Sequence, residues 1–125
     1  MDPAARVMDL DAALRYRETL RRQGKKLVVT NGCFDLLHRG HATYLAAARE
    51  CGDALLILVN SDASVRALKG PSRPVVDEYS RAFLLASLRA VDAAVSVCSA
   101  VVAKLLTRFR TLKTTTSNII TGSEI

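Results

Sequence analysis

The sequence predicts an α/β fold, a Rossmann-like open parallel sheet with flanking helices. Short aliphatic runs alternate with segments of helical periodicity, which is the pattern of strands joined by helical crossovers. Two of the runs end directly in polar residues, TNGCFD and NSD, as strands do where they reach a ligand crevice. With 125 residues, half of them hydrophobic, the chain is expected to form a single domain, 1–125, around one aliphatic core.

The first predicted element is a helix over residues 10–23, within an amino-terminal segment 1–24. Asp9 can cap its amino end, and Gly24 can stop it at the carboxyl end. The run KKLVVT, residues 25–30, is rich in β-branched residues and is followed by an Asn-Gly turn signal. This run therefore predicts a buried strand.

A second helix and a second strand follow. Helical spacing runs over residues 41–50 and stops before Gly52. ALLILV, residues 54–59, is entirely apolar and predicts another buried strand. ASVRAL, residues 63–68, gives a turn or two of helix, after which KGPSRP, residues 69–74, breaks regular structure with a glycine and two prolines.

The alternation continues once more and then weakens. Residues 77–90 have a clear helical pattern, and VDAAVSV, residues 91–97, predicts a third strand. SAVVAKLLTRFR, residues 99–110, can form one more amphipathic helix. The remainder, residues 111–125, is polar and Thr-rich, and its periodicity assigns no element.

The predicted order α-β-α-β-α-α-β implies three parallel strands joined by right-handed crossovers. The carboxyl ends of the first two strands should then open onto one crevice. Three strands leave an edge strand exposed to mispairing. Either a partner chain in a homodimer completes the sheet, or the atypical segment 98–125 packs irregularly against it, or a shortened chain folds poorly.

Composition and charge argue against several classes of protein. Three cysteines without CxxC spacing argue against a disulfide scaffold or a zinc site and indicate a reducing compartment. No signal-peptide pattern begins the chain and no apolar run is of membrane-spanning length, so we expect a cytoplasmic protein without membrane contact. The net charge is +6, but six Lys and Arg cluster within residues 15–26, which favours a solvated helix face over nucleic-acid binding.

The candidate site lies in TNGCFDLLHRGH, residues 30–41, where the first strand passes into a helix. Gly32 allows the backbone to turn sharply and a ligand to approach closely. Phe34 and the pair Leu36 and Leu37 are expected to anchor this loop in the core.

The two histidines of the chain, His38 and His41, bracket Gly40 at the start of that helix and share one face. A helix amino terminus favours an anion, and imidazoles beside it can donate hydrogen bonds to phosphate oxygens. Phosphoryl and nucleotidyl transfer need this kind of charge stabilisation. The alternatives are a surface pair, or one capping and one packed histidine. No metal site is predicted, because no Cys or acid cluster completes a ligand set.

TNGCFDLLHRGH, VNSDASV and LKGPSRPV together resemble the cytidylyltransferase-like nucleotidyltransferase superfamily with its H-x-G-H signature. More narrowly, residues 10–97 resemble the D-glycero-β-D-manno-heptose 1-phosphate adenylyltransferase branch. The resemblance implies that ATP, with Mg²⁺ as cofactor, and a sugar 1-phosphate give a nucleoside-diphosphate sugar and pyrophosphate.

The resemblance also implies roles for individual residues. His38 and His41 match the histidines that stabilise the transition state on the nucleotide phosphates. Lys69 and Arg81 match catalytic cations beside the phosphates. Further nucleotide contacts are implied for Asn31, Gly32, Cys33, Phe34 and Gly40. Substrate-binding positions are implied at Asp35, Asn60, Asp62 and Lys69.

Several of these residues have a plainer interpretation. Lys69, and Arg73 as a weaker phosphate candidate, can instead be ordinary surface cations. Arg81 lies in the first turn of a predicted helix, where a cation opposes the dipole, and this indicates either an anionic partner or an ion pair with an acid of the same turn. Asp62 can cap the short helix after it rather than contact a ligand.

The resemblance weakens after the third predicted strand. A further helix, a fourth strand and a Gly/Asp-rich turn typical of the family are absent, so the carboxyl-terminal part is shortened relative to the family. RTLKTTTSNII, residues 110–120, resembles the closing motif that helps hold the nucleotide. That match implies nucleotide contacts for Arg110, Thr115, Thr116 and Ser117. The alternative is a disordered polar tail.

Three functional hypotheses result. The first is an adenylyltransferase that transfers AMP from ATP to heptose 1-phosphate and releases pyrophosphate, giving ADP-heptose. The second is a cytidylyltransferase that acts on another phosphorylated acceptor, such as glycerol 3-phosphate. The third is a non-catalytic nucleotide-binding remnant that keeps the H-x-G-H loop.

Overall fold

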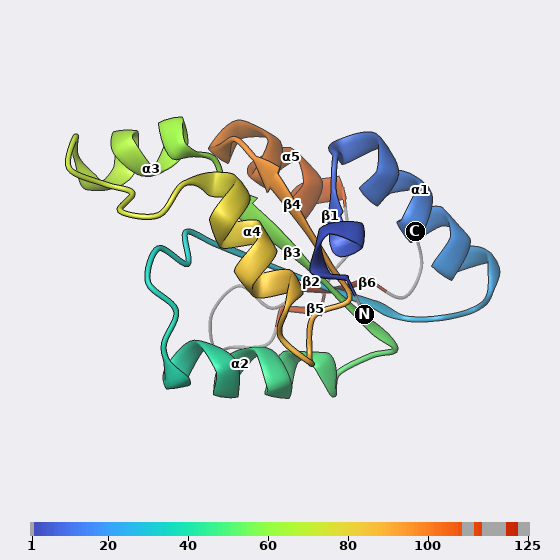
Figure 1. Cartoon of the computed structure of the whole chain (residues 1–125). Helices are drawn as coiled ribbons and strands as arrows, with labels where there is room; N and C mark the ends of the chain where they lie inside the picture. Colours follow the sequence, from blue (N-terminus) through green and yellow to red (C-terminus); the bar gives the residue numbers. More distant parts are fainter. Residues whose placement is uncertain (1, 109–111, 114–119, 123–125) are drawn as a thin grey trace.

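The computed structural model describes residues 2–108, 112–113 and 120–122. Among these residues, one sheet has the strand order β1-β4-β3-β2-β6-β5 (Figure 1). The parallel strands are β1 (Val7–Met8), β4 (Ala93–Val97), β3 (Ala54–Asn60) and β2 (Leu27–Gly32). The antiparallel pair is β6 (Ile120–Gly122) and β5 (Leu112–Lys113). The predicted Rossmann-like α/β class is confirmed.

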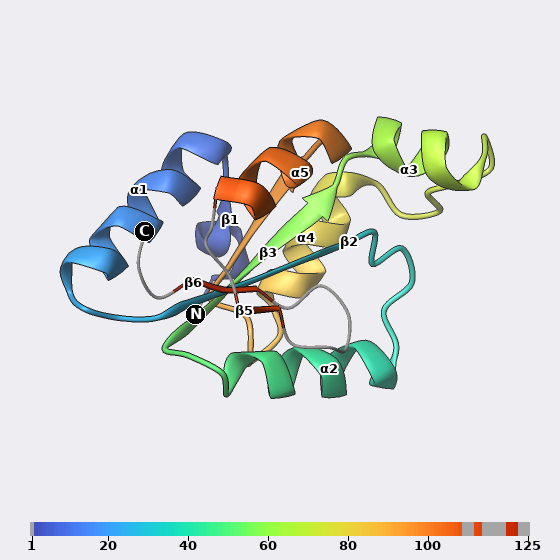
Figure 2. The ribbon, with the colours of Figure 1, turned by 180° about the vertical axis from the view of Figure 1, so that it is seen from behind.

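Helices cover both faces of the sheet (Figures 1 and 2). On one face lie α1 (Leu10–Arg22) and α5 (Ser99–Arg108). On the other lie α2 (Arg39–Arg49) and α4 (Glu78–Ala86). The chain also forms α3 (Asp62–Lys69), beyond the carboxyl end of β3, and a short 3₁₀ helix, η1 (Pro3–Arg6). No helix in the described ranges combines the length and the apolar character that a bilayer crossing requires.

The core consists of two apolar layers, one on each face of the sheet. Leu56 and Leu58 of β3 pack toward α1 and α5, whereas Leu55 and Ile57 of the same strand pack toward α2 and α4. All seven residues of β3 are buried. A strand covered on both faces must be apolar throughout, which is why ALLILV has no polar alternation.

The sheet is larger than the three strands that the sequence predicts. β1 adds a two-residue edge strand, in which Val7 pairs with Ala94, and a segment this short has no detectable periodicity. On the opposite side, β6 pairs antiparallel with β2, and Ile120 is the partner of Val29. In the described part of the carboxyl-terminal segment, β5 and β6 pack against the sheet as paired strands rather than irregularly.

Helix termini follow the predicted capping in one case and differ in two. The Asp9 carboxylate accepts a hydrogen bond from the Ala12 amide at 2.7 Å and begins α1 as predicted. α2 begins two residues before the predicted start, at Arg39, because His38 caps it. α4 ends at Ala86 rather than at residue 90. Beyond Ala86 the backbone forms i→i−3 hydrogen bonds, such as the one from the Leu88 amide to the Leu85 carbonyl, in place of the helical i→i−4 bonds.

Candidate active site

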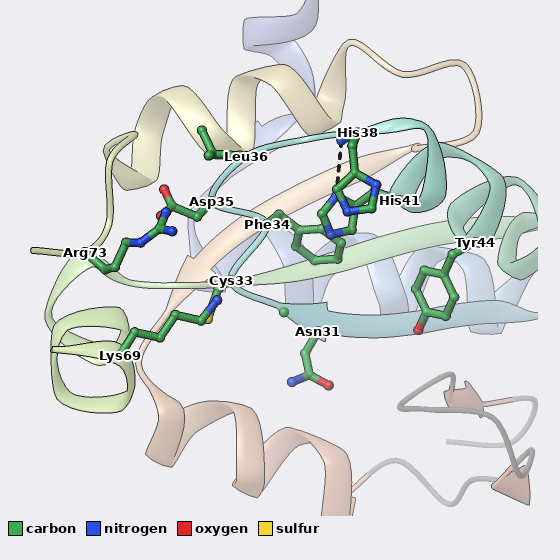
Figure 3. Close-up of a pocket in the computed structure, with 11 residues that line it drawn as sticks. Asn31, Cys33, Phe34, Asp35, Leu36, His38, His41, Tyr44, Lys69 and Arg73 are labelled. Carbon is green, nitrogen blue, oxygen red and sulfur yellow. Dashed lines mark hydrogen bonds and ion pairs between the residues drawn. The ribbon is translucent and has the colours of Figure 1, made fainter.

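A pocket of about 560 Å³ lies at the carboxyl end of β2, between the β2–α2 loop and the loop that follows α3 (Figure 3). The lining residues are Asn31, Gly32, Cys33, Phe34, Asp35, Leu36, His38, His41, Tyr44, Lys69 and Arg73. The pocket is therefore built by the predicted strand-to-helix loop and by the loop rich in glycine and proline.

The β2–α2 loop turns at Phe34, which has a φ of +48°. A bulky residue rarely adopts this left-handed conformation, so the turn is strained. The Phe34 ring is buried and folds back over Gly32, where an added Cβ would lie 2.8 Å from the ring atom Cε2. Gly32 thus makes room for the ring, and the ring meets His41 edge-on with centroids 5.4 Å apart.

The two histidines lie against each other, with ring centroids 3.9 Å apart. His38 is the N-cap of α2, and its Nδ1 accepts a hydrogen bond from the Gly40 amide at 3.0 Å. The His38 amide donates to Nδ1 of His41 at 3.3 Å. A neutral imidazole that accepts at Nδ1 carries its proton at Nε2. Each ring is therefore held in the tautomer that can donate Nε2–H to a ligand in the pocket.

Gly40 provides the space that this arrangement needs. A Cβ at position 40 would lie 2.7 Å from Cε1 and 2.9 Å from Nδ1 of His38. Non-bonded atoms do not approach this closely, so any other residue would displace the His38 ring. The glycine between the histidines is thus required by the packing of the first ring.

The environment of His41 favours its neutral form. Burial lowers the pKa of His41, and the neighbouring His38 and Lys69 lower it further. At neutral pH the ring is therefore a hydrogen-bond donor through Nε2 rather than a cation.

Lys69 and Arg73 bring positive charge to the pocket from the side opposite the histidines (Figure 3). Arg73 is held by Asp35, whose Oδ2 lies 2.7 Å from Nη1 of the guanidinium. The Asp35 carboxylate also accepts hydrogen bonds from the amides of Val75 and Val76. Burial raises the pKa of Asp35, but these hydrogen bonds and the Arg73 charge outweigh it and keep the pKa below its ordinary value. The Asp35 carboxylate therefore anchors the loop that follows α3.

The structure corrects the prediction that Arg81 lies beside the phosphates. Its guanidinium is fully buried and does not line the pocket. The alternative ion pair with an acid of the same turn is also wrong, because the partner is Asp62, with Oδ1 2.7 Å from Nη2 of Arg81. A buried arginine needs a countercharge and acceptors for its donors, and both lie within the protein.

Two further predicted residues also do not line the pocket. Asn60 is buried at the end of β3, and neither Asn60 nor Asp62 is among the lining residues. The cap of α3 is Ser61, whose Oγ accepts a hydrogen bond from the Ser64 amide at 3.3 Å, so the proposed capping role of Asp62 is also wrong. Asp62 instead serves as the countercharge of Arg81.

Most of the predicted site residues do come together. Those that line the pocket are Asn31, Gly32, Cys33, Phe34, Asp35, His38, His41, Lys69 and Arg73. The predicted closing-motif residues, Arg110, Thr115, Thr116 and Ser117, lie outside the described residues.

Sequence reasoning missed two residues of the pocket. Tyr44 follows His41 by three residues on the same helix face, and this spacing could have identified it. Its hydroxyl lies 2.7 Å from Oγ1 of the buried Thr30. Leu36 was expected in the core, but it is exposed at the pocket, and only Phe34 and Leu37 contribute to the core there.

The described part of the chain contains no cluster of three or more His, Cys, Asp or Glu side chains that could hold a metal ion. The acid of the pocket, Asp35, is already bound to Arg73 and to two backbone amides. The pocket therefore offers N–H donors and positive charge, which suit the oxygens of an anion.

Comparison with known proteins gives consistent matches. A family model described as "Cytidylyltransferase-like" matches residues 29–122. A protein of Methylobacillus flagellatus named "Bifunctional protein HldE" is 55% identical over 92 residues, which are 74% of this chain and 19% of that protein. The protein of the same name from Helicobacter pylori strain G27 is 61% identical over 75 residues, which are 60% of this chain and 16% of that protein. The chain spans about a fifth or less of the length of these relatives.

A solved structure has a similar fold. The crystal structure of the lipopolysaccharide core biosynthesis protein from Thermoplasma volcanium superposes with a TM-score of 0.60 and 32% sequence identity. The match covers 67% of each chain.

Proposed function

The chain belongs to the cytidylyltransferase-like family of nucleotidyltransferases, and from this premise we propose that it transfers AMP from ATP to a sugar 1-phosphate. The acceptor in this proposal is heptose 1-phosphate, and the products are ADP-heptose and pyrophosphate. The observation that carries the proposal is the histidine pair: both Nδ1 atoms accept backbone hydrogen bonds, which leaves the proton of each neutral ring at Nε2, and both residues line the pocket.

The chemistry needs no covalent intermediate on the protein. A phosphate oxygen of the acceptor attacks the α-phosphorus of ATP, a new P–O bond forms, and the bond from the α-phosphorus to the bridging oxygen breaks. Negative charge develops on the leaving pyrophosphate. His38 and His41 donate hydrogen bonds to these oxygens, and Lys69 and Arg73 supply positive charge from the other side of the pocket.

The proposed role of Mg²⁺ follows from the residues present. Mg²⁺ keeps several waters and binds readily through substrate phosphates. The pocket carboxylate, Asp35, is engaged by Arg73 and backbone amides, so the ion would enter with ATP and neutralise part of its phosphate charge. In this proposal the residues of the pocket contact and orient the triphosphate, and they do not coordinate the ion directly.

The choice of acceptor rests on the relatives. The matched Thermoplasma protein is described as acting in lipopolysaccharide core biosynthesis, which fits a nucleotide-activated sugar as product. The matched proteins named HldE are bifunctional, and the chain aligns with a small part of each. The proposal therefore concerns one transferase reaction and not the whole activity of those proteins.

Pyrophosphate release from ATP, Mg²⁺ and heptose 1-phosphate tests the proposal. We expect turnover with this pair and little with CTP and glycerol 3-phosphate; the reverse preference would identify a cytidylyltransferase. Binding of ATP without pyrophosphate release with any acceptor would identify a non-catalytic remnant and refute the proposal.

Substitution of the histidines tests the site itself. H38A and H41A should lower kcat far more than they weaken ATP binding, because the donors act on charge that develops in the transition state. T43A is a matched control, since Thr43 is exposed on the same helix and lies outside the pocket lining. An equal loss in binding and turnover would contradict the assigned role.

A further inference from the structure

We propose that Arg81 is a positioning residue, whose buried guanidinium holds the two loops of the pocket in register without touching the substrate. The inference rests on the proposed function for the reaction that it affects. In this inference Arg81 holds protein segments together instead of binding phosphate. The two roles predict different effects on ATP binding and different effects of substituting Asp62.

The contacts of Arg81 join four segments of the chain. Nη1 donates to the carbonyl of Cys33 at 2.8 Å and to the carbonyl of Asn60 at 2.7 Å. Nε donates to the carbonyl of Val76 at 2.8 Å, and Nη2 bonds to Asp62. These partners lie in the β2–α2 loop, at the end of β3, before α4 and at the start of α3. A planar fork of donors can bridge them together, which an ammonium group cannot do.

One branch of this network leads to the histidines. The Cys33 carbonyl belongs to the peptide bond that enters the strained Phe34 turn. A strained conformation persists when its surroundings fix it, and the hydrogen bond from Arg81 does so from one side. The Phe34 ring then packs edge-on against His41, and His41 accepts the hydrogen bond from the His38 amide.

The other branch leads to the cations. Arg81 binds the carbonyl of Val76, and Asp35 binds the amide of the same residue. Asp35 also binds Arg73, so Val76 connects the buried guanidinium to the loop that carries positive charge into the pocket. Arg81 therefore fixes the distance between the histidine side and the cation side of the site.

Removal of the negative charge of Asp62 distinguishes the phosphate-binding role of Arg81 from the positioning role. If Arg81 bound phosphate, loss of the competing negative charge at Asp62 would leave ATP binding unchanged or tighten it. If Arg81 positions the loops, loss of the Asp62 charge weakens the anchor and lowers turnover. The Asp62 side chain is 26% exposed, so the isosteric D62N can be accommodated without a cavity.

The experiment compares R81K and D62N with D92N as the matched control. Asp92 resembles Asp62, since its side chain is 31% exposed and it pairs with Arg49 at 2.9 Å, but it lies at the amino end of β4, away from the pocket. For each variant, kcat, the Kd of ATP and the Tm are measured, together with the imidazole Cε1–H resonances. The chain has two histidines, so H38A assigns both signals.

R81K should lower kcat about ten- to hundredfold, as expected for a small displacement of reacting groups, with little change in the Kd of ATP. D62N should lower kcat less, and both variants should shift the histidine resonances, whereas D92N should lower only the Tm. If R81K does not fold, D62N decides. A weaker ATP affinity with unchanged kcat in R81K, unshifted resonances in D62N, or equal effects of D62N and D92N would overturn the inference. The resonances report on Arg81 even if the wild-type protein releases no pyrophosphate.

Discussion

Replacement of Gly40 by alanine should damage catalysis without damaging the fold. The added Cβ would lie 2.7 Å from Cε1 of His38, whereas non-bonded carbon atoms pack at about 3.5–4.0 Å, so the ring must move by about 1 Å. A misplacement of that size costs up to about a hundredfold in rate, or about 2.7 kcal/mol of transition-state stabilisation. The movement also breaks the hydrogen bond from the Gly40 amide to Nδ1, which sets the tautomer.

The effect on stability should have the opposite sign. Position 40 lies in the first turn of α2, where alanine is favoured over glycine by up to about 1 kcal/mol. The control is A42G, which reverses the propensity change at an exposed position of the same turn and leaves His38 untouched. Measurements of kcat, the Kd of ATP and the Tm on both variants separate the two effects.

A G40A protein with wild-type kcat would refute the argument that the glycine is required by the His38 ring. So would a parallel fall of kcat in A42G, because that variant changes only helix propensity. A G40A protein with lower kcat and unchanged or higher Tm is the expected result.

Three further predictions concern pH and the hydrogen bonds around the pocket. The pKa of His41 is lowered in the folded protein, so the unfolded chain binds a proton at this ring first as the pH falls. The contribution of His41 to the free energy of unfolding is therefore present above the unfolded pKa of about 6.5 and is lost below it. The value of kcat/KM should also fall on the acid side with an apparent pKa below about 6.5, measured with H41A as the reference. D35N should raise the KM for the phosphorylated substrates with a smaller effect on kcat, because Arg73 loses the charge that orients it; an unchanged KM would contradict the role of this pair. Y44F should lower the free energy of unfolding in urea by about 1 kcal/mol, because buried Thr30 loses its hydroxyl partner, and adding T30V should recover part of that loss; a double variant no more stable than Y44F would speak against it.

The order of strands and helices follows from local pattern. Aliphatic runs such as residues 54–59 cannot be solvated, and the spacing of apolar residues in 10–23 suits a helix with one buried face. The same is true of the histidine loop, because a glycine turn, a strand end and a helix start are all encoded within residues 30–41. These features place seven of the predicted residues at one pocket, which Lys69 and Arg73 reach from the loop that follows α3.

The sequence by itself determined the fold class, the strand-to-helix loop and the pair of histidines at its end, because each depends on residues close together in the chain. Only the tertiary structure decided which charges face the ligand. Arg81 and Arg73 are both cations on or near the same loop, yet one is buried against three carbonyls and Asp62 and the other reaches the pocket. Apart from Val76, five residues away, the partners of Arg81 are 19, 21 and 48 residues distant, and Asp35 is 38 residues distant from Arg73. No local pattern encodes such distant contacts. The antiparallel closure of the sheet by β6 is of the same kind, since it pairs residues 120–122 with residues 27–29 at the far end of the chain.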